Sequence, residues 1–97
     1  MPTYVTLLNF TEQGISTVEH SPNRIQAAME LVEEMGGEFQ DFYLTMGAYD
    51  GVAILEFPDD ETLAEYALTL GKAGNARTET LRAFTLEEFE AIADDLR

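Results

Sequence analysis

The segment from Tyr49 to Phe57, YDGVAILEF, is apolar at almost every position, and it constrains the fold more than any other stretch of the chain. A strand with one solvated face alternates between apolar and polar residues, whereas a strand covered on both faces reads as a continuous apolar run. The segment therefore predicts a central strand, and each face of its sheet must be covered by something.

Three further segments are rich in β-branched and aromatic residues or alternate in polarity, which is typical of strands. They are Thr3–Phe10, Glu38–Met46 and Asn75–Phe84. On the second of these, strict alternation places Phe42 and Leu44 on one side and Phe39 and Tyr43 on the other. A turn over Gly47–Asp50 separates this strand from the central one.

Apolar residues at helical spacing predict helices between these strands. One helix is expected to take Ser21 as its N-cap, to carry Pro22 in its first turn and to end at Gly36–Gly37. A second runs from Pro58 to Gly71 or Gly74, with Asp59 or Asp60 as its cap. A capping box from Thr85 to Glu88 opens a last helix. That helix is expected to bury its apolar residues, which are Leu86, Phe89, Ile92, Ala93 and Leu96.

The predicted order of elements is β-α-β-β-α-β followed by a C-terminal helix, which is the ferredoxin-like pattern of an α+β fold. Residues 1–97 suffice for one domain. Two helices would cover one face of the sheet, but the other face still carries apolar residues and no second helical layer remains for it. Because a bare apolar face is unusual on a monomer, we expect two copies to pack sheet against sheet in a homodimer of the α/β-barrel type.

Charge narrows the range of partners. The chain has 5 basic and 19 acidic residues, and its formal net charge is −14. Nucleic acid and anionic membrane surfaces are poor partners, because both are recognised by clustered Lys and Arg. The absence of cysteine excludes disulfides and zinc–thiolate sites. The N-terminal MPTYVTLLNF lacks a basic region and is too short to span a membrane, so we expect a cytoplasmic protein.

Three motifs together carry a family resemblance. They read Gly47-Ala48-Tyr49-Asp50, then Glu56-Phe57-Pro58-Asp59, then Gly74-Asn75-Ala76-Arg77-Thr78 followed by ETLRAF. In this combination the chain resembles the GYD domain family of small bacterial and archaeal proteins over nearly its whole length. The resemblance implies a dimeric α/β-barrel fold of the ferredoxin-like kind, and it implies no particular reaction.

Tyr49 and Asp50 allow two interpretations. In the structural one, Asp50 bonds nearby backbone N–H groups in a turn, and Tyr49 covers the end of the core with its hydroxyl at the rim. In the functional one, both lie at the mouth of the cavity between sheet and helices. The tyrosine would then donate a hydrogen bond to a carbonyl or enolate while the aspartate acts as a base.

Glu56 follows an apolar run and shares a strand face with Val52 and Ile54, where an unpaired carboxylate is costly. We expect Arg77 or Arg82 on the last strand to pair with it. His20 is the single histidine, and one histidine cannot build a multi-histidine metal site. It precedes Ser21-Pro22 and is expected on an exposed turn rather than at a haem or a catalytic centre.

We therefore expect a homo-oligomeric protein that binds a small, mostly apolar molecule in its barrel, without metal or cofactor. The polar groups expected at that ligand are Tyr43, Tyr49, Asp50, Glu56, Arg77 and Thr78. Two alternatives stay open. One is a cofactor-independent enzyme of the monooxygenase or isomerase kind that uses Tyr49 and Asp50, and the other is a purely structural assembly subunit.

Overall fold

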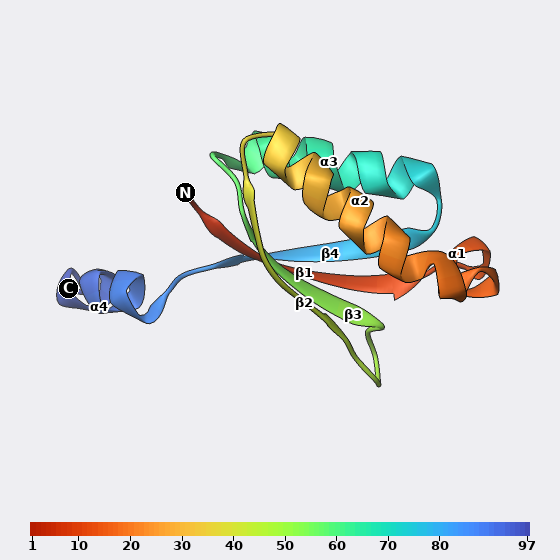
Figure 1. The fold of residues 1–97 in the computed structure, drawn as a ribbon. Helices are drawn as coiled ribbons and strands as arrows, with labels where there is room; N and C mark the ends of the chain where they lie inside the picture. Colours follow the sequence, from red (N-terminus) through yellow and green to blue (C-terminus); the bar gives the residue numbers. More distant parts are fainter.

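The fold is an open four-stranded sheet with two long helices on one face (Figure 1). The computed structural model describes all residues, 1–97. The strands are β1 (Thr3–Phe10), β2 (Glu38–Leu44), β3 (Gly51–Glu56) and β4 (Ala76–Ala83). The helices are α1 (Glu12–Ser16), the 3₁₀ turn η1 (Val18–His20), α2 (Ser21–Glu34), α3 (Asp60–Ala73) and α4 (Leu86–Asp94). The chain order confirms the predicted ferredoxin-like α+β class.

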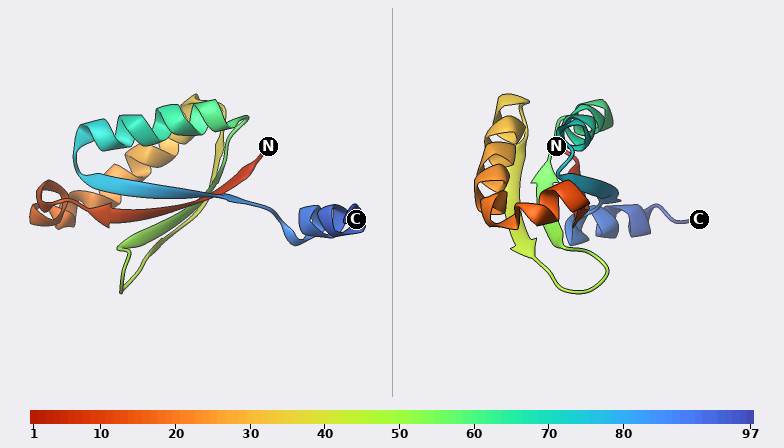
Figure 2. Two further views of the ribbon diagram at one scale, coloured as in Figure 1. Left: turned by 180° about the vertical axis from the view of Figure 1, so that it is seen from behind. Right: turned by 90° about the vertical axis from the view of Figure 1, so that its right-hand side faces the viewer.

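All neighbouring strands are antiparallel, and their order across the sheet is β2-β3-β1-β4. The two central strands are therefore β1 and β3, as the apolar run of β3 predicts. The sheet is not closed into a barrel within one chain. Helices α2 and α3 lie side by side over one face, and the opposite face carries no helix (Figure 2).

Strict alternation along β2 is wrong, because the strand contains a bulge. Its register against β3 shifts between Phe39 and Asp41, so Phe39 pairs with Leu55 and Phe42 pairs with Ala53. Leu55 and Ala53 both face the helices and are buried. An extra residue in one strand reverses the side on which later residues point. Phe39 and Phe42 consequently pack on the same face.

The helix ends follow the predicted capping residues with one exception. Asp59 caps α3 through its side chain, and Gly74 ends that helix with a φ of 88°. Thr85 and Glu88 form the expected capping box at the start of α4. Ser21, however, is not an N-cap, because α2 begins at Ser21 itself and the preceding residue occupies the cap position without a side-chain bond. The hydroxyl of Ser21 is thereby left free for another role.

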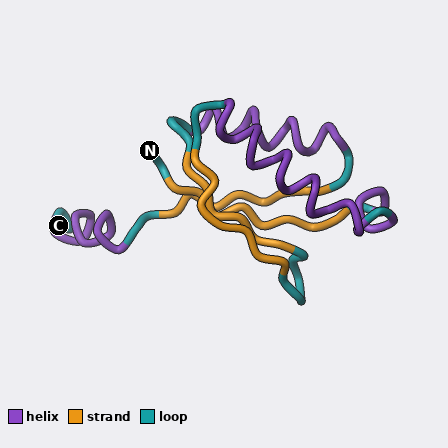
Figure 3. The backbone as a smooth tube through the Cα atoms, in the orientation of Figure 1, coloured by secondary structure: helices purple, strands orange, loops and turns teal.

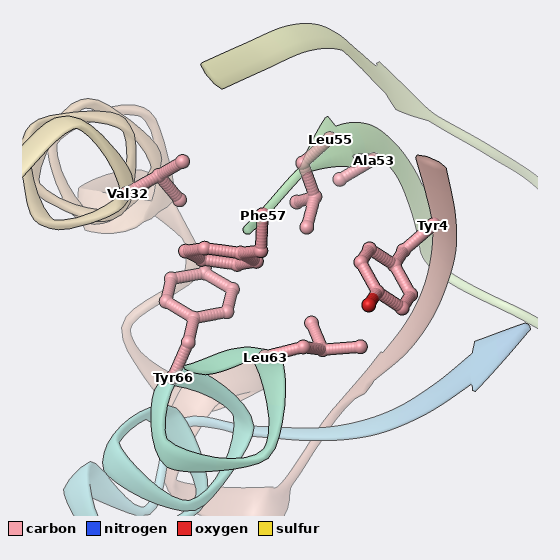
Figure 4. Packing of buried hydrophobic residues seen from close by; sticks show 7 residues of the cluster. All are labelled: Tyr4, Val32, Ala53, Leu55, Phe57, Leu63 and Tyr66. Atoms are coloured by element: carbon pink, nitrogen blue, oxygen red, sulfur yellow. The ribbon is translucent and has the colours of Figure 1, made fainter. Parts of the chain in front are cut away.

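The core lies between the sheet and helices α2 and α3. Figure 4 shows the Phe57 and Tyr66 rings stacked at a tilt, with 5.3 Å between their centroids. Val32 comes from α2, and Leu63 from α3 lies between Tyr66 and the Tyr4 ring. The Tyr4 hydroxyl donates to Asp60 Oδ1 over 2.5 Å at the start of α3. This contact ties the first strand to the second long helix.

The second face of the sheet is apolar and uncovered. Val5 of β1 stands opposite Ile54 of β3 and Leu81 of β4, and the next row pairs Leu7 with Val52. We call the five residues Val5, Leu7, Val52, Ile54 and Leu81 the open face. The first four are only half-buried and Leu81 is 49% exposed. No helix of the chain covers this face (Figure 2), as the sequence predicts.

Helix α4 forms, but it buries nothing. It extends beyond the end of β4, away from the sheet and both long helices (Figures 1 and 3). Leu86, Phe89 and Ile92 are 71%, 58% and 44% exposed, and Ala93 and Leu96 are exposed as well. The expectation that this helix buries its apolar residues within the chain is wrong, because the straight connection from β4 carries it off the body.

Two core tyrosines are expected to ionise at a higher pH than a tyrosine in water. Burial raises the pKa of Tyr66 from its ordinary 10.0 to about 12, and burial with the Asp60 bond raises the pKa of Tyr4 to about 12. A raised pKa means that the folded state favours the neutral phenol. Its contribution to the free energy of unfolding is complete below pH 10 and is lost as the pH rises towards 12.

For Tyr66 the loss is on the order of 2 kcal/mol. Urea denaturation across this pH range should show the free energy of unfolding of the wild type falling more steeply than that of Tyr66→Phe, which lacks the Tyr66 contribution. Parallel slopes for the two proteins would show that Tyr66 ionises normally.

Candidate functional site

A cavity of about 300 Å³ lies between the helix-covered face of the sheet and helices α2 and α3. Of its 19 lining residues, 13 are hydrophobic. The sheet contributes side chains such as Leu8, Phe42 and Ala53, and the helices contribute Ala28 and Leu70. Alanines at facing positions leave the space, since a small side chain on each layer cannot fill the gap between helix and sheet. The volume and lining are typical of a small-molecule pocket.

Two polar residues of the cavity, Ser21 and Arg24, lie where α2 begins. The other polar lining residues are Thr6, Thr69, Asn75 and Thr78. Ser21 and Arg24 are three residues apart, so they lie on the same side of α2 as the apolar lining residues Ile25, Ala28 and Leu31. Ser21 Oγ is buried and has no hydrogen-bond partner in the protein. A buried hydroxyl without a partner is costly and uncommon. A bound polar group is one way to satisfy it.

Arg24 is held by backbone rather than by an acid. Its Nη2 donates to the Thr17 carbonyl over 2.9 Å and to the Thr17 hydroxyl, and its Nη1 donates to the Gly14 carbonyl over 3.4 Å. Helix α1 is fixed in turn to the α3–β4 connection, where Thr11 Oγ1 donates to the Gly74 carbonyl over 2.6 Å. This arrangement holds the guanidinium at the α1 end of the cavity.

Asp50 ties the β2–β3 turn to β1. Its Oδ2 accepts from the Phe10 N–H over 2.9 Å, and its own N–H donates to the Leu8 carbonyl over 2.9 Å. The Thr45 N–H donates to the Asp50 carbonyl, also over 2.9 Å. The Asp50 carboxylate bonds a backbone N–H group, as the structural interpretation expects. That group belongs to Phe10 on β1, however, and not to a residue nearby in the sequence.

Tyr49 reaches over the uncovered side of the sheet. Its hydroxyl donates to Glu79 Oε2 over 2.5 Å, on the far strand β4. That bond, with the negative charge of Glu79, raises the pKa of Tyr49 above its ordinary value. At neutral pH the tyrosine is therefore a hydrogen-bond donor. Tyr49 and Asp50 make their hydrogen bonds with different partners and not with each other.

Glu56 does not pair with Arg77 or Arg82, so that expectation is wrong. Strand β1 lies between β3 and β4, which separates the glutamate from both arginines. Glu56 stands beside Glu38 of β2, and its Oε2 accepts from the Gln40 amide, the residue at the bulge. The bulge thus supplies a neutral partner for this carboxylate.

The six predicted ligand residues are divided between the two sides of the sheet. Thr78 lines the cavity. Tyr43 and Arg77 are exposed, and the register pairs them with Val52 and Asn9 on the other face. Glu56 and the Tyr49–Glu79 contact also belong to that other face. Asp50 lies at the end of the sheet, where it bonds the backbone of Leu8 and Phe10. The structure therefore brings Thr78 alone into the cavity, and a ligand role for the others stays a prediction.

His20 lies in η1 as an exposed residue, with 65% of its side chain accessible, and its Nε2 is 3.7 Å from Glu19 Oε1. No cluster of three or more His, Asp or Glu side chains is arranged to hold a metal ion. None of the helices has the length and hydropathy needed to cross a bilayer.

Sequence reasoning missed Ser21 and Arg24 as cavity residues. A helix-capping role for Ser21 would have used its hydroxyl. A signal for both was present, since they continue the helical spacing of Ile25, Ala28 and Leu31 towards the N-terminus of α2. Polar residues that extend an apolar helical stripe face the same interior space.

An open ferredoxin-like sheet with a motif-bearing β2–β3 turn and a helix-covered cavity defines a small α+β domain. The GYD domain model matches residues 4–93, and the chain belongs to the GYD domain family. The resemblance of the three sequence motifs is thereby confirmed.

Two comparisons give individual relatives, both from Thermus thermophilus. The chain is 33% identical over 92 residues to a "glutamine synthetase and cystathionine beta-lyase binding protein", a match that covers 94% of this chain and 97% of the relative. It is also similar to the crystal structure of TTHA0845, with a TM-score of 0.56 and 29% identity over 88% of this chain and 95% of the other.

Proposed function

We propose that the protein is a homo-oligomeric binding protein that takes a small, mostly apolar molecule into the cavity beneath α2 and α3. The observation that carries this proposal is the cavity of about 300 Å³ between the sheet and the helices, lined mainly by hydrophobic side chains. An apolar space of this size is unfavourable when empty, because its lining loses dispersion contacts. A ligand restores those contacts without any rearrangement of the sheet.

Self-association rests on the open face. Five apolar side chains on three adjacent strands are uncovered, and a second copy can cover them with the same five residues. A twofold contact of this kind is self-complementary, so a single patch serves both partners. Glu79 stands opposite Leu7, so sheet-on-sheet packing would also bring the Tyr49–Glu79 contacts of both copies next to this patch.

The cavity is tested with a neutral probe, 1-octanol, by isothermal titration calorimetry. The wild type is expected to bind one molecule per chain. Ala28→Phe fills the cavity from α2 and should lower the affinity about tenfold or more. Ala64→Phe makes the same change at an exposed position of α3 and should have no effect. Equal affinities for the two variants would place the octanol elsewhere and overturn the proposal.

A second candidate function is docking on a metabolic enzyme, and the exposed apolar side of α4 favours it. The relative named for binding glutamine synthetase and cystathionine beta-lyase supplies the class of partner. A helix with Leu86, Phe89 and Ile92 uncovered is suited to an apolar groove on another protein.

We also propose a cytoplasmic location, with which a chain that lacks cysteine is compatible.

Surface plasmon resonance with glutamine synthetase and cystathionine beta-lyase from the same cells tests this candidate. Phe89→Ser should weaken binding to at least one enzyme about tenfold, whereas Glu90→Gln, its neighbour in the sequence, should not. If wild type and Phe89→Ser bind both enzymes equally, α4 is not the docking element.

The enzyme alternative gains no support from geometry. The Asp50 carboxylate accepts from the Phe10 backbone, and the Tyr49 hydroxyl donates to Glu79, so neither group is directed at a shared substrate position. We therefore do not propose a reaction for this pair.

A further inference from the structure

We infer that the cavity ligand is an apolar carboxylic acid, whose tail lies among the α2, α3 and sheet side chains and whose carboxylate meets Arg24 and Ser21. This inference rests on the proposed binding function and specifies the chemical class of the ligand.

The first step concerns charge. The chain has 19 acidic residues, yet no Asp or Glu lines the cavity, and Arg24 is the one charged residue that does. Arg24 forms no ion pair, since the single contact between a basic and an acidic side chain in the structure joins His20 and Glu19. In a protein with a net charge of −14, an arginine inside an apolar cavity without an acidic partner is an uncompensated positive charge. A partly buried guanidinium that has carbonyl partners but no carboxylate beside it favours the binding of an anion.

The second step concerns hydrogen-bonding capacity. A guanidinium has five N–H donors in a planar fork. The contacts of Arg24 engage Nη1 and Nη2 with the carbonyls of Gly14 and Thr17 and the Thr17 hydroxyl, and they leave Nε without an acceptor. Ser21 Oγ, on the same side of α2, has no partner at all. A carboxylate has two acceptor oxygens and can satisfy both residues at once.

The third step concerns size and position. Arg24 and Ser21 lie at the start of α2, while Leu31, Phe39 and Phe42 line the cavity farther along the helix and the sheet. The cavity therefore has its one charged residue at one end, and most of the side chains farther along are hydrophobic. A volume of 300 Å³ corresponds to about ten water molecules, at roughly 30 Å³ each. A carboxylate with a tail of about seven carbons or one aromatic ring matches this volume, and medium-chain fatty acids and arylalkanoic acids share that chemistry.

Calorimetric titration with octanoate and 1-octanol as a matched pair tests the inference, because the two differ in the head group and share the same chain length. The wild type is expected to bind octanoate about tenfold more tightly than 1-octanol, the ratio that a charge-assisted hydrogen bond supplies. In Arg24→Gln the ratio should fall to near one, with the affinity for 1-octanol unchanged.

Arg24 also holds α1, so Arg24→Gln could impair folding. Ser21→Ala provides an independent variant, because the hydroxyl that it removes bonds nothing in the protein. It should weaken octanoate binding several-fold without lowering the melting temperature. Ser16→Ala, at an exposed hydroxyl of α1, is the matched control and should leave octanoate binding unchanged.

The outcomes separate the two proposals. Equal affinities for octanoate and 1-octanol, with no effect of Arg24→Gln or Ser21→Ala on octanoate, would overturn the carboxylate inference and leave apolar binding intact. Failure of the wild type to bind either probe would overturn the binding function itself, and the inference with it.

Discussion

Val5→Asp is expected to convert the protein from an oligomer to a single chain of 10.8 kDa. Val5 lies in the centre of the open face, between Ile54 on β3 and Leu81 on β4. In a twofold contact the variant would bury two like-charged carboxylates, each at a cost of several kcal/mol. The dissociation constant should rise about a hundredfold or more. Sedimentation equilibrium on the wild type and the variant measures this change directly.

Leu68→Asp is the matched control, because it introduces the same charge at an apolar residue that is 74% exposed on α3. It should leave the mass of the oligomer unchanged. Retention of the wild-type mass by Val5→Asp would show that the open face is not the contact between copies.

Phe57→Ala is expected to lower the free energy of unfolding by about 3 to 5 kcal/mol. The Phe57 ring is fully buried and stacks against Tyr66, and its neighbours Val32 and Leu55 are also fully buried. The truncation leaves a cavity, and its cost rises with the part of that cavity that the neighbouring side chains do not fill. Since small domains are stable by about 5 to 15 kcal/mol, this one change removes a large part of the total.

Phe84→Ala gives the comparison, since that ring is 55% exposed and lies against the Arg82 guanidinium, 4.5 Å from its centroid. Its loss should cost about 1 kcal/mol or less. Urea denaturation at one fixed protein concentration compares the two variants. Similar losses would contradict the placement of the core beneath α2 and α3.

The fold was predictable because local signals and global pattern agree. The apolar run of β3, the Asp59 cap and the Thr85–Glu88 capping box each specify an element on their own. The prediction of side-chain directions along β2 failed, because the pattern of residue types does not contain its cause. The bulge between Phe39 and Asp41 changes strand register by one residue, and a period-2 pattern cannot reveal it.

Helix α4 shows a different limit of sequence reasoning. Its amphipathic pattern correctly predicts a helix. The pattern does not indicate whether the apolar side packs within the same chain or against another molecule. The straight course of β4 into α4 leaves Phe89 exposed, so nothing within the chain covers it. The open face presents the same situation for Val5 and Ile54.

The site was less predictable than the fold, because residues from distant segments form it. Tyr49 and Asp50 are adjacent in the sequence, which suggests that they act as a pair. In the structure Tyr49 bonds Glu79 on β4, whereas Asp50 bonds Phe10 on β1. Arg24 and Ser21 carry no motif. Their proposed role depends on the cavity, on the unbonded Ser21 hydroxyl and on the lack of an acid beside Arg24. These are properties of the packed structure.

Native mass spectrometry of the protein, purified without denaturant, tests the proposed function most directly, because one spectrum reports both assembly and retained ligand. We predict a multiple of the 10.8 kDa subunit that carries a reproducible small mass, lost when Ala28 is replaced by Phe. A single 10.8 kDa subunit that carries no added mass, even after incubation with octanoate or 1-octanol, would contradict both the assembly through the open face and the binding function of the cavity.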